Sequence, residues 1–214
     1  MLVAILGTGS VACTIALRLL GAGHEVVLGA RNPATATDRD WVRELGGKVE
    51  VVSLSAAASA GEVVVNATPG STTVEMLIDL DAAALTGKVL IDTANAVVFG
   101  ESGPLLMYPN GSLAERIQQA VPRAKVVKTL NTMNTAVQAD PTGMAGPTSA
   151  FVSGDDPEAR SLVTSLLHDM GWPPDSVIDL GGIASARGPE HYFMLFFGLA
   201  RALGTRRFNI AVVR

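Results

Sequence analysis

The sequence predicts an α/β protein built on a doubly wound parallel sheet, followed by a small C-terminal α/β extension. Short apolar runs alternate with helical patterns along the chain, which is typical of a parallel sheet covered by helices on both faces. A glycine-rich turn follows the first apolar run. The 214 residues, 48% hydrophobic and 17% charged, suffice for one large buried core and a small appendage.

The first two thirds of the chain supply six expected strands and the helices between them. Residues 2–6 are a short apolar run typical of a buried parallel strand, and residues 10–21 carry apolar side chains at helical spacing. The other expected strands are 25–29, 49–53, 62–67, 88–94 and 124–130. The other expected helices are 34–45, a short Ala-rich segment before the fourth strand, 72–80 and 112–120.

The same alternation continues after residue 145. We expect strands at 149–154 and 175–181, helices at 157–170 and about 184–203, and an edge strand at 208–213. Pro and Gly residues concentrate at 140–149, as in a connecting segment. The sequence therefore predicts one domain over residues 1–145 and a small C-terminal domain over residues 146–214.

Charge and cysteine content narrow the cellular setting. The net charge of −4 gives no electrostatic reason to expect nucleic acid or an anionic membrane as a partner. Cys13 is the single cysteine and cannot form an internal disulfide, which suits a reducing compartment. No signal peptide is expected, and the apolar stretch 192–203 is too short to span a bilayer. These features predict a cytoplasmic protein.

The glycine turn at residues 7–12, GTGSVA, has the G-x-G-x-x-A form of a dinucleotide fingerprint. A strand precedes it, a helix follows, and a second strand comes at the expected distance, so the context supports a Rossmann-type fold. Gly7 permits the tight turn, Gly9 lets the backbone approach a pyrophosphate, and Ala12 allows close packing of helix and strand. The helix start offers free N–H groups to phosphates, flanked by Thr8, Ser10 and Val11.

The second strand ends without the acidic residue that NAD-binding sites place near the adenosine ribose. Residues 26–33 read VVLGARNP, so Ala30 leaves space and Arg31 offers a permanently charged fork suited to phosphate. Asn32 adds hydrogen-bond donors. We therefore predict NADP(H) as the cofactor, against the alternative of a surface arginine with no cofactor preference.

Uncharged polar residues recur where three later strands end. In open α/β sheets ligands bind beyond the carboxyl ends of the strands. The loops in question are 66–70, 92–95 and 131–134. We expect them to orient the nicotinamide and a second ring, with each asparagine alternatively serving as a turn or cap residue.

No obvious acid–base group accompanies these loops. His191, beside Glu190, is the best candidate, although the same residues also read as a helix start. Cys13 lies in the first helix, where a packing role is expected, and no metal-ligand spacing appears. Such a site suits hydride transfer between two cofactor-like rings, where the protein holds donor and acceptor face to face.

Together these segments resemble the F-420-dependent NADP oxidoreductase family. The resemblance rests on the order and spacing of GTGSVA, LGAR, NATPGS, DTAN, VVKTLNTMN, FVSGDDPEA and FNIAVVR. It implies a Rossmann domain that binds NADPH and a small C-terminal domain that completes a cleft for coenzyme F-420, a 5-deazaflavin. Hydride would pass directly between the two rings. Related ferric reductase domains use a flavin instead.

The resemblance also implies roles for individual residues. Gly7, Thr8, Gly9, Ser10 and Val11 would hold the pyrophosphate, and Arg31 with Asn32 the 2′-phosphate, where family members often carry Ser before the arginine and this chain carries Ala30. Ala67, Thr68 and Pro69 would line the nicotinamide side, with Asn95 also on the cofactor, while Asn131, Met133 and Asn134 would face the acceptor. The segment 131–141 departs from the pattern of deazaflavin users. Candidates for the anionic F-420 tail are Arg116, Arg123 and Arg187, each alternatively a solvated surface residue.

The expected function is hydride transfer from NADPH to a flavin-like acceptor, with F-420 as the leading candidate and another flavin as an alternative co-substrate. A second possibility is an imine or carbonyl reductase with His191 as acid. A third is a non-catalytic NADP(H)-binding redox sensor whose 192–203 helix contacts a partner. Because such helices more often form a core or a dimer interface, a homodimer is expected.

Overall fold

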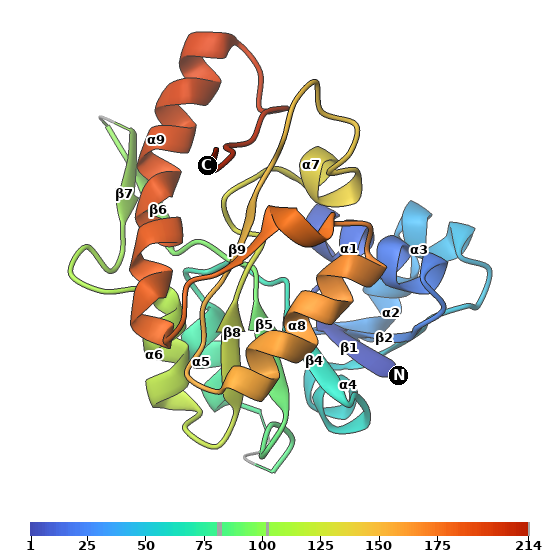
Figure 1. Cartoon of the computed structure of the whole chain (residues 1–214). Coiled ribbons are helices and arrows are strands. Elements are labelled where there is room, and N and C mark those ends of the chain that lie inside the picture. Colours follow the sequence, from blue (N-terminus) through green and yellow to red (C-terminus); the bar gives the residue numbers. More distant parts are fainter. Residues whose placement is uncertain (81–82, 102, 214) are drawn as a thin grey trace.

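A computed structural model describes residues 1–80, 83–101 and 103–213. Its centre is a six-stranded parallel sheet in the order β3-β2-β1-β4-β5-β8 (Figure 1). The chain reverses its winding direction between β1 and β4, so the sheet is doubly wound, as predicted. The strands are β1 (Leu2–Leu6), β2 (Glu25–Ala30), β3 (Glu50–Ser53), β4 (Val63–Asn66), β5 (Val89–Asp92) and β8 (Lys125–Lys128).

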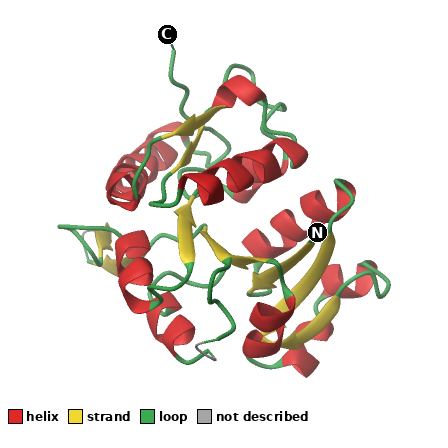
Figure 2. Cartoon of the chain, turned by 60° about the horizontal axis from the view of Figure 1, so that its bottom comes forward, coloured by secondary structure: helices red, strands yellow, loops and turns green. Residues whose placement is uncertain are grey.

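Helices cover both faces of this sheet (Figure 2). Alternate residues of one strand enter opposite cores: Val26 and Leu28 pack in one apolar cluster and Val27 in the other. The first cluster includes residues of α1 (Ser10–Gly21), α3 (Asp40–Glu44), α7 (Thr135–Ala139) and α8 (Pro157–Asp169). The second includes residues of α4 (Leu54–Ala60), α5 (Thr73–Ile78) and α6 (Leu113–Ala120).

The C-terminal part packs directly onto the sheet. Its strands β9 (Ala150–Val152) and β10 (Val177–Asp179) pair in parallel, and an antiparallel bridge joins Ser153 to Lys128 of β8. Helix α8 shares the first apolar cluster with α1, and the Arg18 guanidinium donates to the Met170 carbonyl at 2.9 and 2.6 Å. The division into domains at residue 145 stays a prediction.

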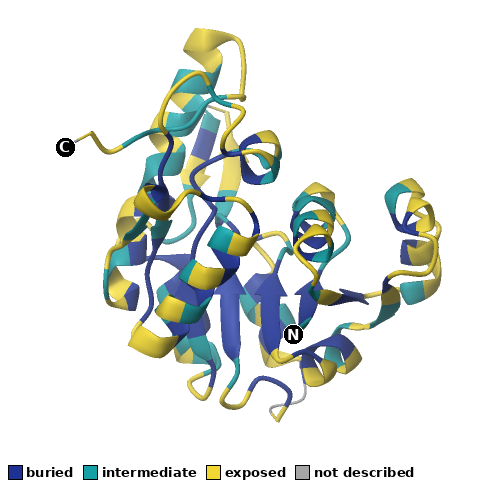
Figure 3. Cartoon of the chain, turned by 45° about the vertical axis from the view of Figure 1, so that its right-hand side comes forward, coloured by how far each residue is buried: buried dark blue, intermediate teal, exposed yellow. Residues whose placement is uncertain are grey.

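The last long helix stands along one side of the molecule. Two short 3-10 segments, Pro174–Ser176 and Ile183–Ala186, flank β10, and α9 (Arg187–Leu203) follows. Beside α9 lies an antiparallel hairpin of β6 (Val97–Gly100) and β7 (Gly103–Leu106) (Figure 1). The sheet is largely buried except at its edge strand β3, whereas the upper part of α9 is largely exposed or half-buried (Figure 3).

Two local expectations need correction, and two features were not foreseen. The helix expected over 34–45 is two helices, α2 (Pro33–Thr37) and α3, because Arg39 between them is extended at φ −66° and ψ 135°. The edge strand expected over 208–213 is wrong: this segment is irregular and meets the chain through the bond from Ser149 N–H to Ile210 carbonyl, at 2.9 Å. Neither the β6–β7 hairpin nor α7 was expected.

No helix in the described part of the chain has the length and apolar character that crossing a membrane requires.

Candidate active site

The carboxyl ends of four strands lie in one row across the sheet. Leu6 of β1 pairs with Asn66 of β4, Asn66 with Asp92 of β5, and Asp92 with Lys128 of β8. The glycine turn and the loops after β4, β5 and β8 therefore leave the sheet side by side. This edge, next to the change of winding direction between β1 and β4, is where open α/β sheets bind ligands.

The first glycine of the turn is fixed by its surroundings. Gly7 has φ +118°, and its N–H donates to the Gly29 carbonyl at 2.8 Å. A Cβ built on Gly7 would lie 2.6 Å from the Ala67 carbonyl oxygen, so the turn touches the loop after β4. A side chain here would push apart the two loops expected to border the cofactor.

The second glycine faces open space. Gly9 is exposed, and a Cβ built on it would meet nothing within 4 Å. It is also the N-cap of α1, and no side chain caps the free N–H groups of the first turn there. Thr8 and Val11 beside it are half-buried, and Ser10 is exposed. The open space and uncapped N–H groups fit a pyrophosphate that takes the place of a side chain.

Arg31 directly follows β2, and its guanidinium is available to bind a ligand. It is exposed, and the described residues offer it no hydrogen bond or ion pair. The neighbouring Asn32 caps α2, accepting a long 3.4 Å bond from Thr35 N–H at its side-chain oxygen, so its amide nitrogen keeps its donors. Both residues fit the proposed contact with a 2′-phosphate.

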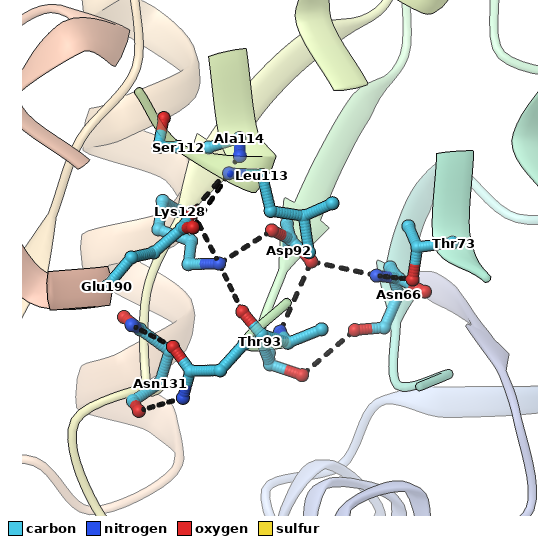
Figure 4. Close-up of polar contacts among 12 residues, drawn as sticks. Asn66, Thr73, Asp92, Thr93, Ser112, Leu113, Ala114, Lys128, Asn131 and Glu190 are labelled. Carbon is cyan, nitrogen blue, oxygen red and sulfur yellow. Dashed lines mark hydrogen bonds and ion pairs between the residues drawn. The ribbon is translucent and has the colours of Figure 1, made fainter. Parts of the chain in front are cut away.

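The loop after β4 is held by polar contacts among its own residues and with Asp92 of β5 (Figure 4). The Asn66 amide nitrogen donates to Asp92 Oδ1 at 2.7 Å and to Thr73 Oγ1 at 3.2 Å. The Asn66 side-chain oxygen accepts from the Thr68 N–H at 3.2 Å and from its hydroxyl at 2.6 Å. The backbone of residues 67–69 therefore has a defined path along the expected nicotinamide side, where Ala67 is half-buried and Pro69 exposed.

The loops after β5 and β8 are joined by two asparagines. Asn95 donates to the Asn131 carbonyl at 2.7 Å, and Asn131 donates to the Asn95 side-chain oxygen at 2.9 Å. Met133 packs in the first apolar cluster, and Asn134 caps α7 by accepting from Val137 N–H at 3.2 Å. Each residue expected to face the acceptor thus has a structural partner, and its contact with an acceptor stays a prediction.

Sequence reasoning missed a buried ionic cluster at this edge, formed by Lys128, Asp92 and Glu190 (Figure 4). Lys128 Nζ lies 2.8 Å from Asp92 Oδ2 and 3.0 Å from Glu190 Oε1, and it also donates to the Ala94 carbonyl. The Lys128 and Asp92 side chains are fully buried. The available signal was a lysine and an aspartate ending apolar strands, since buried charges require partners.

The carboxylates of Asp92 and Glu190 favour the protonated, charged form of Lys128. Burial alone would lower the pKa of Lys128, but the charges and hydrogen bonds of Asp92 and Glu190 outweigh it, so its pKa lies above the usual value. Its three N–H groups are all directed to acceptors. Because Lys128 is fully buried, its ammonium is closed off from direct contact with a substrate.

The other titratable residues considered for this site also have partners within the protein. His191 Nε2 lies 3.1 Å from the Gly111 carbonyl oxygen. Arg187 donates to both carboxylate oxygens of Glu115, at 2.9 and 2.6 Å, and this hydrogen bonding lowers the pKa of Glu115. No group of three or more potential metal ligands occurs within residues 1–80, 83–101 and 103–213.

The two other arginines considered for an anionic tail are Arg116 and Arg123. Arg116 sits over the Tyr108 ring, 5.6 Å from its centroid. Arg123 precedes β8, and its carbonyl accepts from Gly87 N–H at 2.8 Å, which places its backbone at the amino edge of the sheet.

Comparison with known proteins places this geometry in a family. The family model described as NADP oxidoreductase, coenzyme F-420-dependent, matches residues 2–96. A crystal structure from Arthrobacter sp. FB24, named as a candidate F-420-dependent NADP reductase, is 41% identical, with a TM-score of 0.93 over 99% of both chains. The chain belongs to the F-420-dependent NADP oxidoreductase family. It is accordingly an NADP-dependent oxidoreductase.

Two curated relatives show the range of proteins that share this chain's sequence. The F-420-dependent NADP reductase of Methanocaldococcus jannaschii is 27% identical over 99% of this chain and 100% of its own length. The rat metalloreductase STEAP3 is 32% identical over 88% of this chain, which spans only 35% of that protein. The family member described here thus matches whole reductases as well as one part of a larger metalloreductase.

Proposed function

We propose that this NADP-dependent oxidoreductase transfers hydride from NADPH to a flavin-like acceptor, and that the acceptor is coenzyme F-420. When bound, NADPH supplies two electrons as a hydride, and a proton from water completes the reduced acceptor. The protein's own part is to bind the pyrophosphate at Gly9, hold the 2′-phosphate at Arg31 and fix the 67–69 loop beside the nicotinamide.

The observation that carries this proposal is that two candidate proton donors at the carboxyl edge, Lys128 and His191, are held by other groups of the protein. An imine or carbonyl reductase needs a group that delivers a proton to the substrate. Among the described residues of this edge, Lys128 donates all of its N–H groups to protein acceptors and His191 lies against Gly111. Ring-to-ring hydride transfer makes no such demand. The full-length similarity to an F-420-dependent reductase supports F-420 over another flavin.

An acceptor panel tests this proposal. NADPH oxidation is followed by absorbance with F-420, with FMN, with a cyclic imine, and with no acceptor. We expect turnover with F-420 to exceed turnover with FMN at least tenfold, which corresponds to about 1.4 kcal/mol in transition-state binding. Faster turnover with the imine would replace the proposal with the reductase alternative. Tight NADPH binding without turnover on any acceptor would favour the redox sensor.

We also propose a cytoplasmic homodimer formed through the apolar surface of α9 and the β6–β7 hairpin. Phe99 is 68% exposed, and Leu195 and Leu105 are 58% and 55% exposed. The Phe99 ring meets the Phe197 ring edge-on at 6.1 Å between centroids, so hairpin and helix form one surface. The exposed Gly198 on α9 has open space at its Cβ position, which lets a second copy of the helix approach closely about a two-fold axis.

Leu195→Glu is expected to convert the dimer to a monomer, because the interface would have to bury a charge. Light scattering after size-exclusion chromatography measures the mass. Leu17→Glu, which changes an exposed leucine of α1, is the matched control and should remain dimeric. A native protein that is monomeric at every concentration would rule out the homodimer.

A further inference from the structure

Lys128 connects loops that belong to different parts of the proposed site. Its ammonium binds the Ala94 carbonyl in the loop after β5, Asp92 at the end of β5, and Glu190 in the first turns of α9. All three contacts are fully or almost fully buried. One side chain thus joins the sheet edge to the C-terminal helix (Figure 4).

The two carboxylates carry this connection further. Asp92 uses Oδ2 for Lys128 and Oδ1 for the Asn66 amide at 2.7 Å and the Ala94 N–H at 3.2 Å. Asn66 in turn holds Thr68, in the loop on the expected nicotinamide side. A continuous chain of charged and polar contacts therefore runs from α9 through Lys128 to the donor loop.

Glu190 anchors the other end of the chain. Its carboxylate accepts from the Leu113 N–H at 2.7 Å and the Ala114 N–H at 3.0 Å, at the start of α6, in addition to Lys128. The helix start favours the negative charge, and the ammonium balances it. If Lys128 moved away, the buried carboxylates of Asp92 and Glu190 would be left without a cation between them. The cluster therefore strongly favours one arrangement.

We propose that Lys128 is a positioning residue for hydride transfer, which sets the 93–95 and 66–69 loops relative to α9 so that donor and acceptor rings meet at reacting distance. This inference rests on the proposed function. Lys128 touches neither ring and gives no proton; it acts through Asp92 and Asn66 on the donor side. Misplacement of reacting groups by about 1 Å costs on the order of 100-fold in rate.

Lys128→Met tests the proposal, with Lys88→Met as the matched control. Lys88 also donates to two backbone carbonyls, those of Ala58 and Ser59 at 2.7 Å each, but from the residue before β5, at the opposite edge of the sheet. For Lys128→Met we expect the single-turnover rate of hydride transfer per bound NADPH to fall on the order of 100-fold. The dissociation constant for NADPH should change less than about threefold, because the phosphate contacts remain.

A purely structural lysine would give a different result. It would lower the melting temperature and the yield of folded protein, but leave the rate per NADPH-binding site unchanged. Lys88→Met should behave in that way, with a single-turnover rate within about twofold of the native protein. Equal single-turnover rates for Lys128→Met and Lys88→Met would overturn the positioning role.

Hydrogen exchange supplies a readout that is independent of any acceptor. In Lys128→Met, backbone amides of residues 66–68, Gly70 and 93–96 should exchange at least tenfold faster, while those of β2 remain as in the native protein. Exchange rates that change equally throughout the protein, or that do not change in these loops, would reject the positioning role. This holds even if the native protein is shown to reduce F-420. If the native protein fails to reduce F-420 while these loops do loosen, the proposed function falls and the structural coupling stands.

Glu190→Gln keeps the test informative if Lys128→Met does not fold. The amide retains an oxygen for Lys128 and removes one buried negative charge, so the cluster keeps its cation paired with Asp92. We expect a smaller loss, roughly tenfold in single-turnover rate, with NADPH affinity unchanged. An unaltered rate in folded Glu190→Gln would show that α9 is not coupled to the donor loop.

Discussion

Gly9→Ala is expected to abolish tight NADPH binding while leaving the fold nearly as stable as before. Its φ of −84° suits any residue and a Cβ would meet nothing within 4 Å, so the free protein accommodates the methyl group. The melting temperature should fall by no more than about 4 °C. The methyl group would occupy the space through which the backbone approaches the pyrophosphate, so the dissociation constant for NADPH should rise roughly 100-fold or more, about 2.7 kcal/mol.

Gly7→Ala is the matched variant with the opposite expectation. Its φ of +118° and the Ala67 carbonyl 2.6 Å from the new Cβ impose backbone strain and a clash before any ligand binds. We expect a loss of about 2–4 kcal/mol in the free energy of unfolding and a melting temperature lower by roughly 5–15 °C. Circular dichroism and calorimetric titration with NADPH measure both variants. Native NADPH affinity in Gly9→Ala would refute the placement of the pyrophosphate.

Arg31→Ala is expected to separate the two nicotinamide cofactors. The exposed guanidinium has no partner among the described residues, so removing it disturbs no internal contact. Loss of a charge-assisted bond of about 1.5–3 kcal/mol should raise the KM for NADPH roughly 10- to 100-fold. The KM for NADH, which lacks the 2′-phosphate, should change less than about twofold.

Arg43→Ala provides the control for a general loss of positive charge. Arg43 lies on α3 in the same part of the fold and pairs with Asp40 in a mostly exposed contact. In steady-state kinetics, the KM values of Arg43→Ala for NADPH and for NADH should each stay within about twofold of those of the native protein. If Arg31→Ala weakens NADPH and NADH alike, the assignment of Arg31 to the 2′-phosphate is wrong.

The segments expected to bind the cofactor could be picked out from the sequence because their signals are local. One short stretch contains the glycine turn, the helix after it and the strand that Arg31 follows. The residue types in each of these segments are enough to indicate its expected role. The strand pattern also placed residues 66–70, 92–95 and 131–134 at one edge of the sheet, as the register now confirms. Local patterns thus predicted the fold class and the sheet edge at which these loops lie.

The buried ionic cluster and the hairpin were less predictable, the cluster because its contacts join distant parts of the chain. Lys128 meets Asp92 and Glu190, and no local pattern indicates which carboxylates a buried lysine will reach. The β6–β7 hairpin was missed because residues 97–106 are interrupted by glycine and proline, which weakens a strand pattern. Asn134 took the capping role that its residue type also favours.

The most direct test of hydride transfer between NADPH and F-420 uses NADPH deuterated at the transferring position of the nicotinamide. The protein is mixed with this NADPH and F-420 in ordinary water, and the reduced F-420 is examined by mass spectrometry. Direct transfer predicts one deuterium in the reduced acceptor and a slower single-turnover rate than with unlabelled NADPH. Reduced F-420 without deuterium, or no reduction of F-420 by a protein that binds NADPH, would contradict the proposed reaction.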